Sequence, residues 1–423
     1  MSSKKPYCIA PWTSLYVDPK GTVFPCCVWQ DTGMSSGDMK GFGNLNNQSL
    51  QEIYTSEEAL RVKKLMLDNI AIPECTHCIK QEEKSGEWSY RKYMDRHFGH
   101  IINDYEKEDS KLALWDVRIS NFCNFKCRSC SHLFSSAWYE DAVKLETTDG
   151  IGIATSGNKA LITLNNKDNF FEDLEPHFDY VEEVYFAGGE PLIMPEHYKI
   201  LDKLIAKNKK IKVRYNTNLS VLDRKNETLE KYWEFFDLVD IGISIDGIHG
   251  IGEYIRTGFN HTNVINNIKR LQAFIKKERE AGKKSVMRYS ITISILNIFH
   301  LFDFVDFFIE NKLLTKYSNL QPNTLYWPNH LNMQLLPPAA VDEFKEKFDS
   351  FDFSRIEDEH VRKMTELFFY DAYEHLKKEK NFSQDLHHFY LRTKKLDETR
   401  KEKFLEVYKD SPLLKYVRQY WDN

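Results

Sequence analysis

Three cysteines, Cys123, Cys127 and Cys130, are separated by gaps of three and two residues. Thiolates at this spacing on one loop can bind a single [4Fe-4S] cluster through three of its four irons. No fourth cysteine is nearby in the sequence, so the fourth iron would stay open to a ligand from outside the protein. An open iron is a reactive position, and the spacing therefore predicts redox chemistry at this loop.

A second set of cysteines lies upstream. Cys8 and Cys26 are separated by seventeen residues, and Cys75 and Cys78 follow as a Cys-x2-Cys pair. Four thiolates suffice to close a tetrahedral metal site. The spacing alone is compatible with both a zinc ribbon and an iron-sulfur cluster. Cys27, directly after Cys26, would then be a spare thiol.

Residues 112–327 must position the central loop. Apolar strand-like runs alternate there with amphipathic helical stretches, which is the pattern of a mostly parallel α/β sheet. We expect six strands, over residues 112–119, 181–187, 211–216, 239–245, 286–294 and 320–327. Six strands fit a partial (β/α) barrel, in which the chemistry lies at the carboxyl ends of the strands. The cysteine loop follows the first of these strands.

Polar and glycine-containing sequences follow the later predicted strands. Gly188-Gly189-Glu190-Pro191 follows the second predicted strand, and Asn218 follows the third. Ser244 and Asp246 lie at the end of the fourth strand, with Arg256 downstream, and Ser294 lies at the end of the fifth. Paired glycines permit close backbone approach, and a carboxylate accepts hydrogen bonds from an ammonium group. Alone, Gly-Gly-Glu is most often just a turn.

The combination of Cys-x3-Cys-x2-Cys with Gly-Gly-Glu-Pro after the next strand resembles the radical S-adenosylmethionine (SAM) superfamily. The resemblance implies that the open iron binds SAM and that residues 188–191 bind its amino group. It also implies that Ser244 and Arg256 hold the SAM carboxylate, although a surface salt bridge is the alternative for Arg256. One departure is Ser129, because the family usually has an aromatic residue before the third cysteine.

The same resemblance places three further residues near SAM, namely Asn218, Asp246 and Ser294. The upstream set resembles the twitch domain, the shortened SPASM domain, which binds one auxiliary [4Fe-4S] cluster. Twelve residues separate Cys8 from Gly21, and four separate Gly21 from Cys26. This spacing favours Cys26 over Cys27 as the ligand beside Cys8, Cys75 and Cys78. The domain precedes the barrel here, as in the N-terminal twitch group.

The predicted fold is therefore α/β, a partial (β/α)6 TIM-like barrel with a small N-terminal twitch iron-sulfur domain and a C-terminal helical extension. We expect the twitch domain over residues 1–100, the barrel over 101–338 and the extension over 339–423. Within the extension, Lys- and Glu-rich helices are expected over residues 341–348, 356–378 and 396–408.

The resemblance implies a radical SAM oxidoreductase with two [4Fe-4S] clusters and SAM. SAM would be cleaved reductively to a 5′-deoxyadenosyl radical, which abstracts hydrogen from a substrate carbon. An auxiliary cluster with four protein thiolates has no open iron, so we expect it to transfer an electron and complete a two-electron oxidation. A flavodoxin or ferredoxin-type protein would supply electrons.

Two substrate classes stay open. A small molecule such as a sugar, cyclitol or nucleotide is expected, and the alternative is a peptide that the enzyme crosslinks or epimerises. An alternative of another class is a non-catalytic iron-sulfur scaffold or electron carrier. Such a protein would not need residues 188–191.

The composition of this 423-residue chain limits the classes of partner that it can bind. Its net charge of −5 is small against 58 basic and 63 acidic residues, which does not favour extended nucleic-acid binding. No apolar run reaches transmembrane length and no secretion signal is evident, so we expect a cytoplasmic protein without a membrane partner. Eight cysteines in such a protein indicate metal or redox chemistry more than disulfides.

Overall fold

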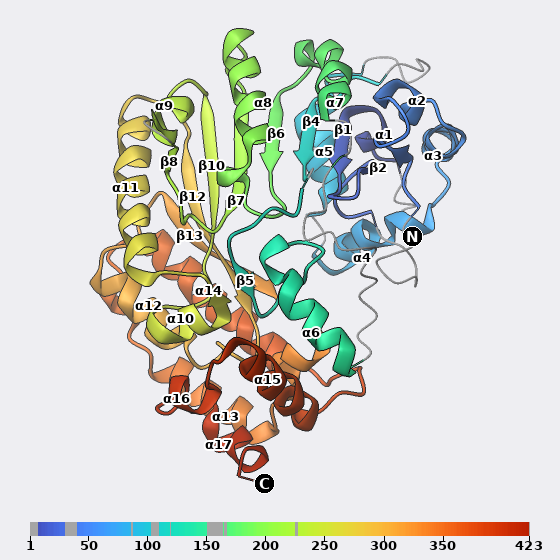
Figure 1. Ribbon diagram of the computed structural model, residues 1–423. Helices are drawn as coiled ribbons and strands as arrows, with labels where there is room; N and C mark the ends of the chain where they lie inside the picture. Colours follow the sequence, from blue (N-terminus) through green and yellow to red (C-terminus); the bar gives the residue numbers. More distant parts are fainter. Residues whose placement is uncertain are drawn as a thin grey trace. The chain divides into compact units, whose positions relative to one another are not determined.

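The computed structural model describes residues 7–29, 40–85, 88–102, 110–118, 120–149, 164, 167–224 and 227–422 (Figure 1). The chain forms two compact units. The first consists of Met1–Asn121, Leu161–Gly189 and Met194–Arg214, and the second of Phe122–Ala160, Glu190–Ile193 and Tyr215–Asn423. The expected three-domain division stays a prediction.

In the first unit, one sheet joins the N-terminal segment to strands of the expected barrel. Its order is β6 (Glu183–Phe186), β4 (Leu114–Val117), β1 (Ser14–Val17), β2 (Thr22–Phe24) and β3 (Gly43–Asn44). β1 runs parallel to β4 with Tyr16 opposite Asp116, and β4 runs parallel to β6 with Asp116 opposite Tyr185. The two-residue periodicity of strands places these three side chains on the same face of the sheet.

The first unit also contains several helices. They are α1 (Ala10–Thr13), α2 (Leu50–Tyr54), α3 (Glu57–Leu67), α4 (Thr76–Ser85), α5 (Tyr90–Phe98), α7 (Lys167–Asp173) and α8 (Pro195–Ala206), with 3-10 turns at Pro73–Cys75 and Glu175–Asp179. Trp115 packs edge-on against Phe178 with ring centroids 5.0 Å apart, and Phe186 packs against His197 of α8 at 4.7 Å. Ser56 caps α3 by accepting from the Ala59 backbone N–H.

The second unit contains a parallel sheet in the order β13 (Ser318–Thr324), β12 (Val286–Ile293), β10 (Leu238–Ser244) and β7 (Lys212–Thr217), of which β7 begins in the first unit. β10 pairs with β12, and β12 pairs with β13. These strands overlap the predicted ones, and the α/β class with parallel strands is confirmed. The last strand is shorter than expected, because β13 ends at Thr324 and leaves Trp327 exposed.

Amphipathic helices pack on this sheet, as the amphipathic stretches between the predicted strands indicate. α11 (His261–Glu280) is capped by Asn260 and buries an apolar stripe that includes Val264, Ile268 and Leu271. The other elements here are β5 (Lys126–Cys127), α6 (Tyr139–Asp149), β8 (Asp223–Arg224), β9 (Glu227–Thr228), α9 (Leu229–Trp233), α10 (His249–Ile255), β11 (Arg256–Thr257) and α12 (Leu301–Glu310). β5 and β11 form an antiparallel ribbon outside the main sheet.

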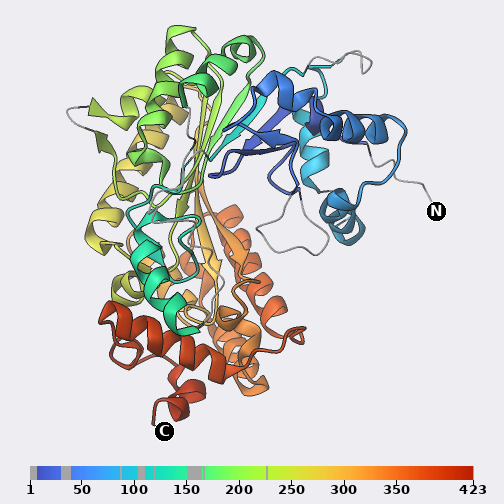
Figure 2. The same cartoon turned by 45° about the vertical axis from the view of Figure 1, so that its right-hand side comes forward.

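The C-terminal part of the second unit is helical, as predicted. It contains α13 (Pro338–Ser350), α14 (Glu359–Leu376), α15 (Leu386–Arg400), α16 (Phe404–Val407) and α17 (Leu414–Val417). The helix expected over residues 396–408 is interrupted, because Lys401 has φ 58° and ends α15. α15 lies beside α6 (Figures 1 and 2).

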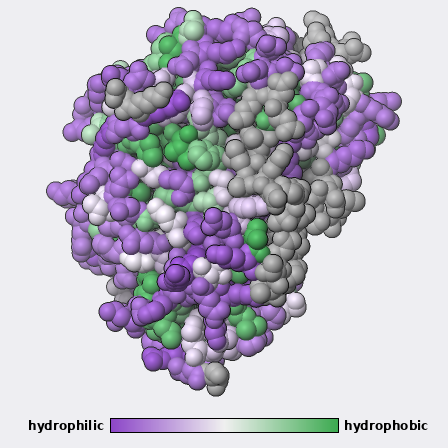
Figure 3. All heavy atoms as spheres, viewed as in Figure 1, coloured by the Kyte–Doolittle hydropathy of each residue, from purple (hydrophilic) through white to green (hydrophobic). Residues whose placement is uncertain are grey.

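On the face shown in Figure 3, hydrophilic residues predominate and hydrophobic residues occur in small patches. Within the described part of the chain, no helix is long and apolar enough to cross a membrane.

Candidate functional site

The three cysteines of the central loop lie close together in the second unit. Cys127 belongs to β5, and the Cys130 backbone N–H donates to the Cys127 carbonyl oxygen at 3.0 Å. Burial, followed by the charges of the neighbouring Cys127 and Cys123, raises the pKa of Cys130 to about 12. Burial followed by the charge of Glu190 raises the pKa of Cys123 to about 12. Three neighbouring, partly buried thiols of this kind become thiolates when a metal replaces their protons, which fits an iron-sulfur cluster.

Glu190 of the predicted amino-group motif is buried at 1% exposure and is bonded within the protein. Its Oε1 accepts from Thr217 Oγ1 at 2.7 Å and from the Leu192 N–H at 3.0 Å, and its Oε2 accepts from the Asn218 N–H at 2.6 Å. Burial raises the pKa of Glu190 to about 7, against these three hydrogen bonds, which lower it. The carboxylate therefore fixes the end of β7, where Asn218 lies.

The rest of the motif consists of Gly188, Gly189 and Pro191. Both glycines have positive φ, 74° and 53°, a conformation that other residues rarely adopt. A Cβ at Gly188 would lie 2.8 Å from the Cβ of Arg118, so this position excludes any side chain. Pro191 begins a 3-10 turn that ends at Ile193.

Arg256 is buried rather than on the surface, with 8% exposure. It stands opposite Cys127 in the β5–β11 ribbon, and its Nη1 lies 3.6 Å from the Cys127 Sγ. Its Nε lies 2.8 Å from Oδ2 of Asp246, which also accepts from the Thr292 N–H at 2.7 Å through Oδ1. The structure thus brings Arg256, Asp246 and the cluster loop together, and a surface salt bridge is the wrong description of Arg256.

The remaining predicted SAM contacts occupy strand ends. Asn218 donates to the Asn124 side chain at 3.0 Å, which ties it to the cluster loop. Ser244 is the last residue of β10 and stands opposite Ser290 of β12. Ser294 is buried, and its backbone N–H donates to Asn297 Oδ1 at 2.8 Å in the turn after β12.

The upstream cysteines gather in the first unit. Cys8 precedes α1, Cys26 follows β2, and Cys75 and Cys78 lie at the start of α4. Burial raises the pKa of Cys8 well above its usual value, and Cys75 and Cys78 are among the charges that raise it further. Burial also raises the pKa of Cys26, with further increases from Cys27, Cys8 and Cys75. These thiols are therefore close enough to raise one another's pKa values, although they do not converge on the position of a single metal ion.

Cys27 faces a different environment. Burial, followed by the charge of Asp116, raises its pKa to about 11, against the charges of Arg118 and Arg214, which lower it. A hydrogen bond with Tyr90 also lowers it. Asp116 lies in β4, Arg118 directly follows β4, Arg214 lies in β7, and Tyr90 begins α5. The Cys27 thiol therefore lies near the sheet.

All eight cysteines are free thiols. Among the described residues, no three His, Cys, Asp or Glu side chains converge as ligands of one metal ion.

The sequence did not point to a group of charged residues around the cluster loop. Arg128, next to Cys127, is buried and forms ion pairs with Asp397 and Glu402. Both acids lie at the end of α15, about 270 residues away, so no local spacing could have linked them to the loop.

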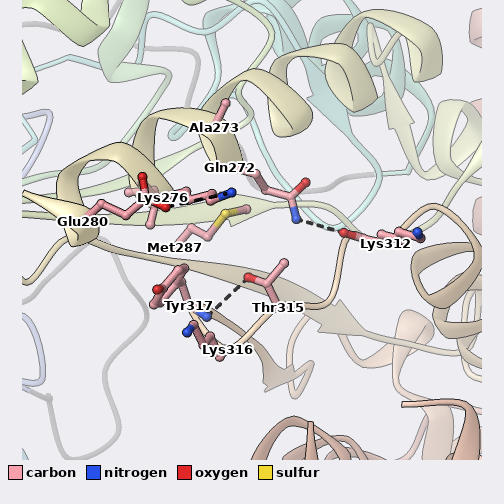
Figure 4. A pocket seen from close by; sticks show the side chains of 10 residues that line it. Gln272, Ala273, Lys276, Glu280, Met287, Lys312, Thr315, Lys316 and Tyr317 are labelled. Atoms are coloured by element: carbon pink, nitrogen blue, oxygen red, sulfur yellow. Dashed lines mark hydrogen bonds and ion pairs between the residues drawn. The ribbon is translucent and has the colours of Figure 1, made fainter. Parts of the chain in front are cut away.

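A pocket in the second unit is lined by residues that include Gln272, Lys276, Met287, Lys312 and Tyr317 (Figure 4). It lies at the amino ends of β12 and β13, because Met287 is the second residue of β12 and Tyr317 precedes β13. The candidate cofactor residues follow the carboxyl ends of the strands instead.

Two known families match the chain. Residues 117–290, which contain the Cys123 loop, the glycine motif and Arg256, match the Radical SAM superfamily. Residues 8–79, which contain the four upstream cysteines, match SPASM, an iron-sulfur cluster-binding domain. The chain belongs to the radical SAM superfamily. The cofactors of these two domains are [4Fe-4S] clusters and SAM.

Several solved structures are similar at low identity, and the chain spans about 60% of the length of the first of them. Native anSMEcpe with bound AdoMet is 17% identical, with a TM-score of 0.35 over 57% of this chain and 60% of that chain. Streptococcus suis SuiB is 16% identical, with a TM-score of 0.32 over 82% of this chain and 69% of that chain. SuiB bound to the precursor peptide SuiA is 16% identical, with a TM-score of 0.28 over 80% of this chain and 69% of that chain. No curated protein matches the sequence.

Proposed function

We propose that this radical SAM protein is an oxidoreductase whose Cys123, Cys127 and Cys130 thiolates hold the SAM-binding [4Fe-4S] cluster. The observation that carries the proposal is the position of Arg256, 3.6 Å from the Cys127 sulfur and ion-paired with Asp246. A guanidinium held there can bind a carboxylate beside the cluster. When bound, the cluster and SAM supply a 5′-deoxyadenosyl radical that abstracts hydrogen from a substrate carbon.

The chain's own residues orient these groups. Asp246 fixes the Arg256 fork, and Glu190 fixes the end of β7 at Asn218. Together with Gly188, Gly189, Pro191, Ser244 and Ser294, these residues are the proposed SAM contacts. The polar residues Glu190, Asn218, Asp246, Arg256 and Ser294 are buried, and such burial excludes water from a reactive centre.

The thiolates of Cys8, Cys26, Cys75 and Cys78 are the proposed ligands of the auxiliary cluster. Four protein ligands leave no open iron, so this cluster would accept one electron from the substrate radical. The net reaction is then a two-electron oxidation, with electrons entering from a flavodoxin or ferredoxin-type donor in the cytoplasm.

A small molecule such as a sugar, cyclitol or nucleotide is the proposed substrate. Peptide modification is the second candidate. Residues 8–79 match SPASM, and the resemblance to proteins with the full-length SPASM domain implies a peptide substrate. Incubation with deuterated candidates of both classes separates the two. Deuterium must appear in 5′-deoxyadenosine only with the true substrate class.

The experiment that tests the radical assignment is anaerobic reduction of the reconstituted protein with SAM. Wild type is expected to release 5′-deoxyadenosine, whereas Cys127→Ala releases none. Cys27→Ala is the matched control, because that thiol faces Asp116 and Tyr90. Release by Cys127→Ala would defeat the assignment.

A further inference from the structure

The two residues beside Cys127 are both anchored by carboxylates. Lys126 Nζ lies 3.2 Å from the carboxylate of Asp141 in α6. On the other side, the Arg128 side chain is only 2% exposed and pairs with Asp397 and Glu402. The cluster loop is therefore held from both flanks of its central cysteine.

Arg128 is also held by an aromatic residue. Its guanidinium lies 3.5 Å from the ring centroid of Tyr254, and its Nε donates to the Tyr254 carbonyl oxygen at 3.0 Å. The Tyr254 hydroxyl donates in turn to Asp397 Oδ1 at 2.7 Å. Asp397 Oδ2 accepts from the Phe404 N–H at 2.7 Å, so both of its oxygens are bonded.

Glu402 connects the loop to the second strand of the ribbon. Its Oε1 accepts from Thr257 Oγ1 at 2.8 Å, and Thr257 directly follows Arg256 in β11. Its other oxygen pairs with Arg128. The Glu402 carboxylate thus contacts residues in or directly beside both strands of the ribbon. It therefore stabilises the register in which Arg256 lies opposite Cys127.

Arg400 adds a second link between α15 and this region. Its Nε lies 2.8 Å from Asp141 Oδ2, and its guanidinium lies 4.5 Å from the ring centroid of Trp138. The Trp138 indole N–H donates to the Cys127 carbonyl oxygen at 2.7 Å. The end of α15 therefore reaches the backbone of Cys127 itself.

The ion pairs around the loop join equal numbers of cations and carboxylates. The cations and carboxylates that form ion pairs here are Lys126, Arg128, Arg256 and Arg400 with Asp141, Asp246, Asp397 and Glu402. Removal of one partner of a buried ion pair leaves an uncompensated charge in a region of low dielectric. Such a charge near an iron-sulfur cluster changes its reduction potential.

We propose that Asp397 and Glu402 are positioning residues of the SAM-cluster site, which makes the end of α15 part of that site. Asp397 neutralises and orients Arg128, and Glu402 fixes the β5–β11 register that brings Arg256 to Cys127. The proposal rests on the proposed function, because it assumes that the cluster and SAM bind at this loop.

The test measures the midpoint potential of the SAM cluster and the Kd for SAM in the reconstituted full chain. Asp397→Asn is expected to shift the potential to a more positive value, because Arg128 loses one of its two counter-charges. It also weakens SAM binding by about tenfold, as expected for the loss of an outer-shell partner. Asp397→Glu restores the potential.

Glu278→Gln is the matched control. Glu278 is a buried carboxylate that pairs with Lys283 at 2.8 Å at the end of α11. This variant leaves the potential and the SAM affinity at the wild-type values. Equal shifts in Asp397→Asn and Glu278→Gln would overturn the proposal, as would wild-type values in a folded Asp397→Asn protein.

Arg128→Lys keeps the test decisive if Asp397→Asn does not fold. Lysine keeps the positive charge but lacks the planar fork that reaches both acids. The potential then stays at the wild-type value while SAM affinity falls severalfold, and unchanged affinity would overturn the proposal. Wild type that binds no SAM would instead defeat the proposed function.

Discussion

Arg256 and Cys127 face each other across a two-residue antiparallel ribbon, with the Arg256 Nη1 3.6 Å from the Cys127 sulfur. The ribbon has few hydrogen bonds of its own, so its register depends on side chains outside it. Asp246 holds the guanidinium from one side. This arrangement gives a cationic, directional group beside a cluster-binding thiol.

Replacement of Arg256 with lysine tests the directional part of this contact. Lysine keeps the charge but cannot bind Asp246 and a SAM carboxylate with one planar group, so the Kd for SAM is expected to rise about tenfold or more. Isothermal titration of the reconstituted protein measures this. Arg270→Lys, in the ion pair with Asp223, is the control and leaves the Kd unchanged.

Single alanine variants of Cys26 and Cys27 separate the ligand from the spare thiol. Cys26 lies with Cys8 and Cys75, so Cys26→Ala is expected to lose about four irons per chain, the content of one [4Fe-4S] cluster. Cys27→Ala keeps the wild-type iron content, because that thiol faces Asp116 and Tyr90. Equal iron loss in the two variants would contradict the assignment.

Gly188→Ala tests the backbone of the glycine motif. Gly188 has φ 74°, and an added Cβ would lie 2.8 Å from the Cβ of Arg118, so the apo protein is expected to lose about 1–3 kcal/mol of unfolding free energy. Urea unfolding measures the change. Gly250→Ala is the control, since its Cβ in α10 would meet no atom within 4 Å. Stability loss in the control that equals the loss in Gly188→Ala would contradict the steric account.

Glu190→Gln separates a structural role from a role in SAM binding. The Glu190 oxygens accept from Thr217, Leu192 and Asn218, and an amide turns one acceptor into a donor. One buried donor then lacks a partner, so the apo protein is expected to lose about 1–3 kcal/mol of unfolding free energy. Wild-type stability of apo Glu190→Gln would show that these three bonds do not fix the end of β7.

The features that depend on residues close together in the sequence could be predicted from it. The intervals between Cys123, Cys127 and Cys130 and the Gly-Gly-Glu sequence lie within a few residues, so the loop and the turn could be recognised directly. The parallel strands were predictable because their apolar runs are continuous. The pairing of β1 with β4 was not, because β1 has only four residues and its partner lies about a hundred residues away.

Long-range polar contacts escaped prediction for a related reason. The C-terminal helices could be expected from their periodicity, but nothing in the sequence of α15 indicates that Asp397 binds Arg128. The break at Lys401 was also missed, because lysine rarely adopts positive φ. That break lets the Glu402 N–H bond the Asp397 carbonyl oxygen at 3.0 Å and brings both acids to one point.

The most direct test of the two-cluster account is a count of iron, sulfide and zinc per chain after anaerobic reconstitution. The account predicts about eight irons, about eight sulfides and no zinc, as two [4Fe-4S] clusters require. About four irons together with one zinc would contradict it, because the four upstream cysteines would then form a structural zinc site.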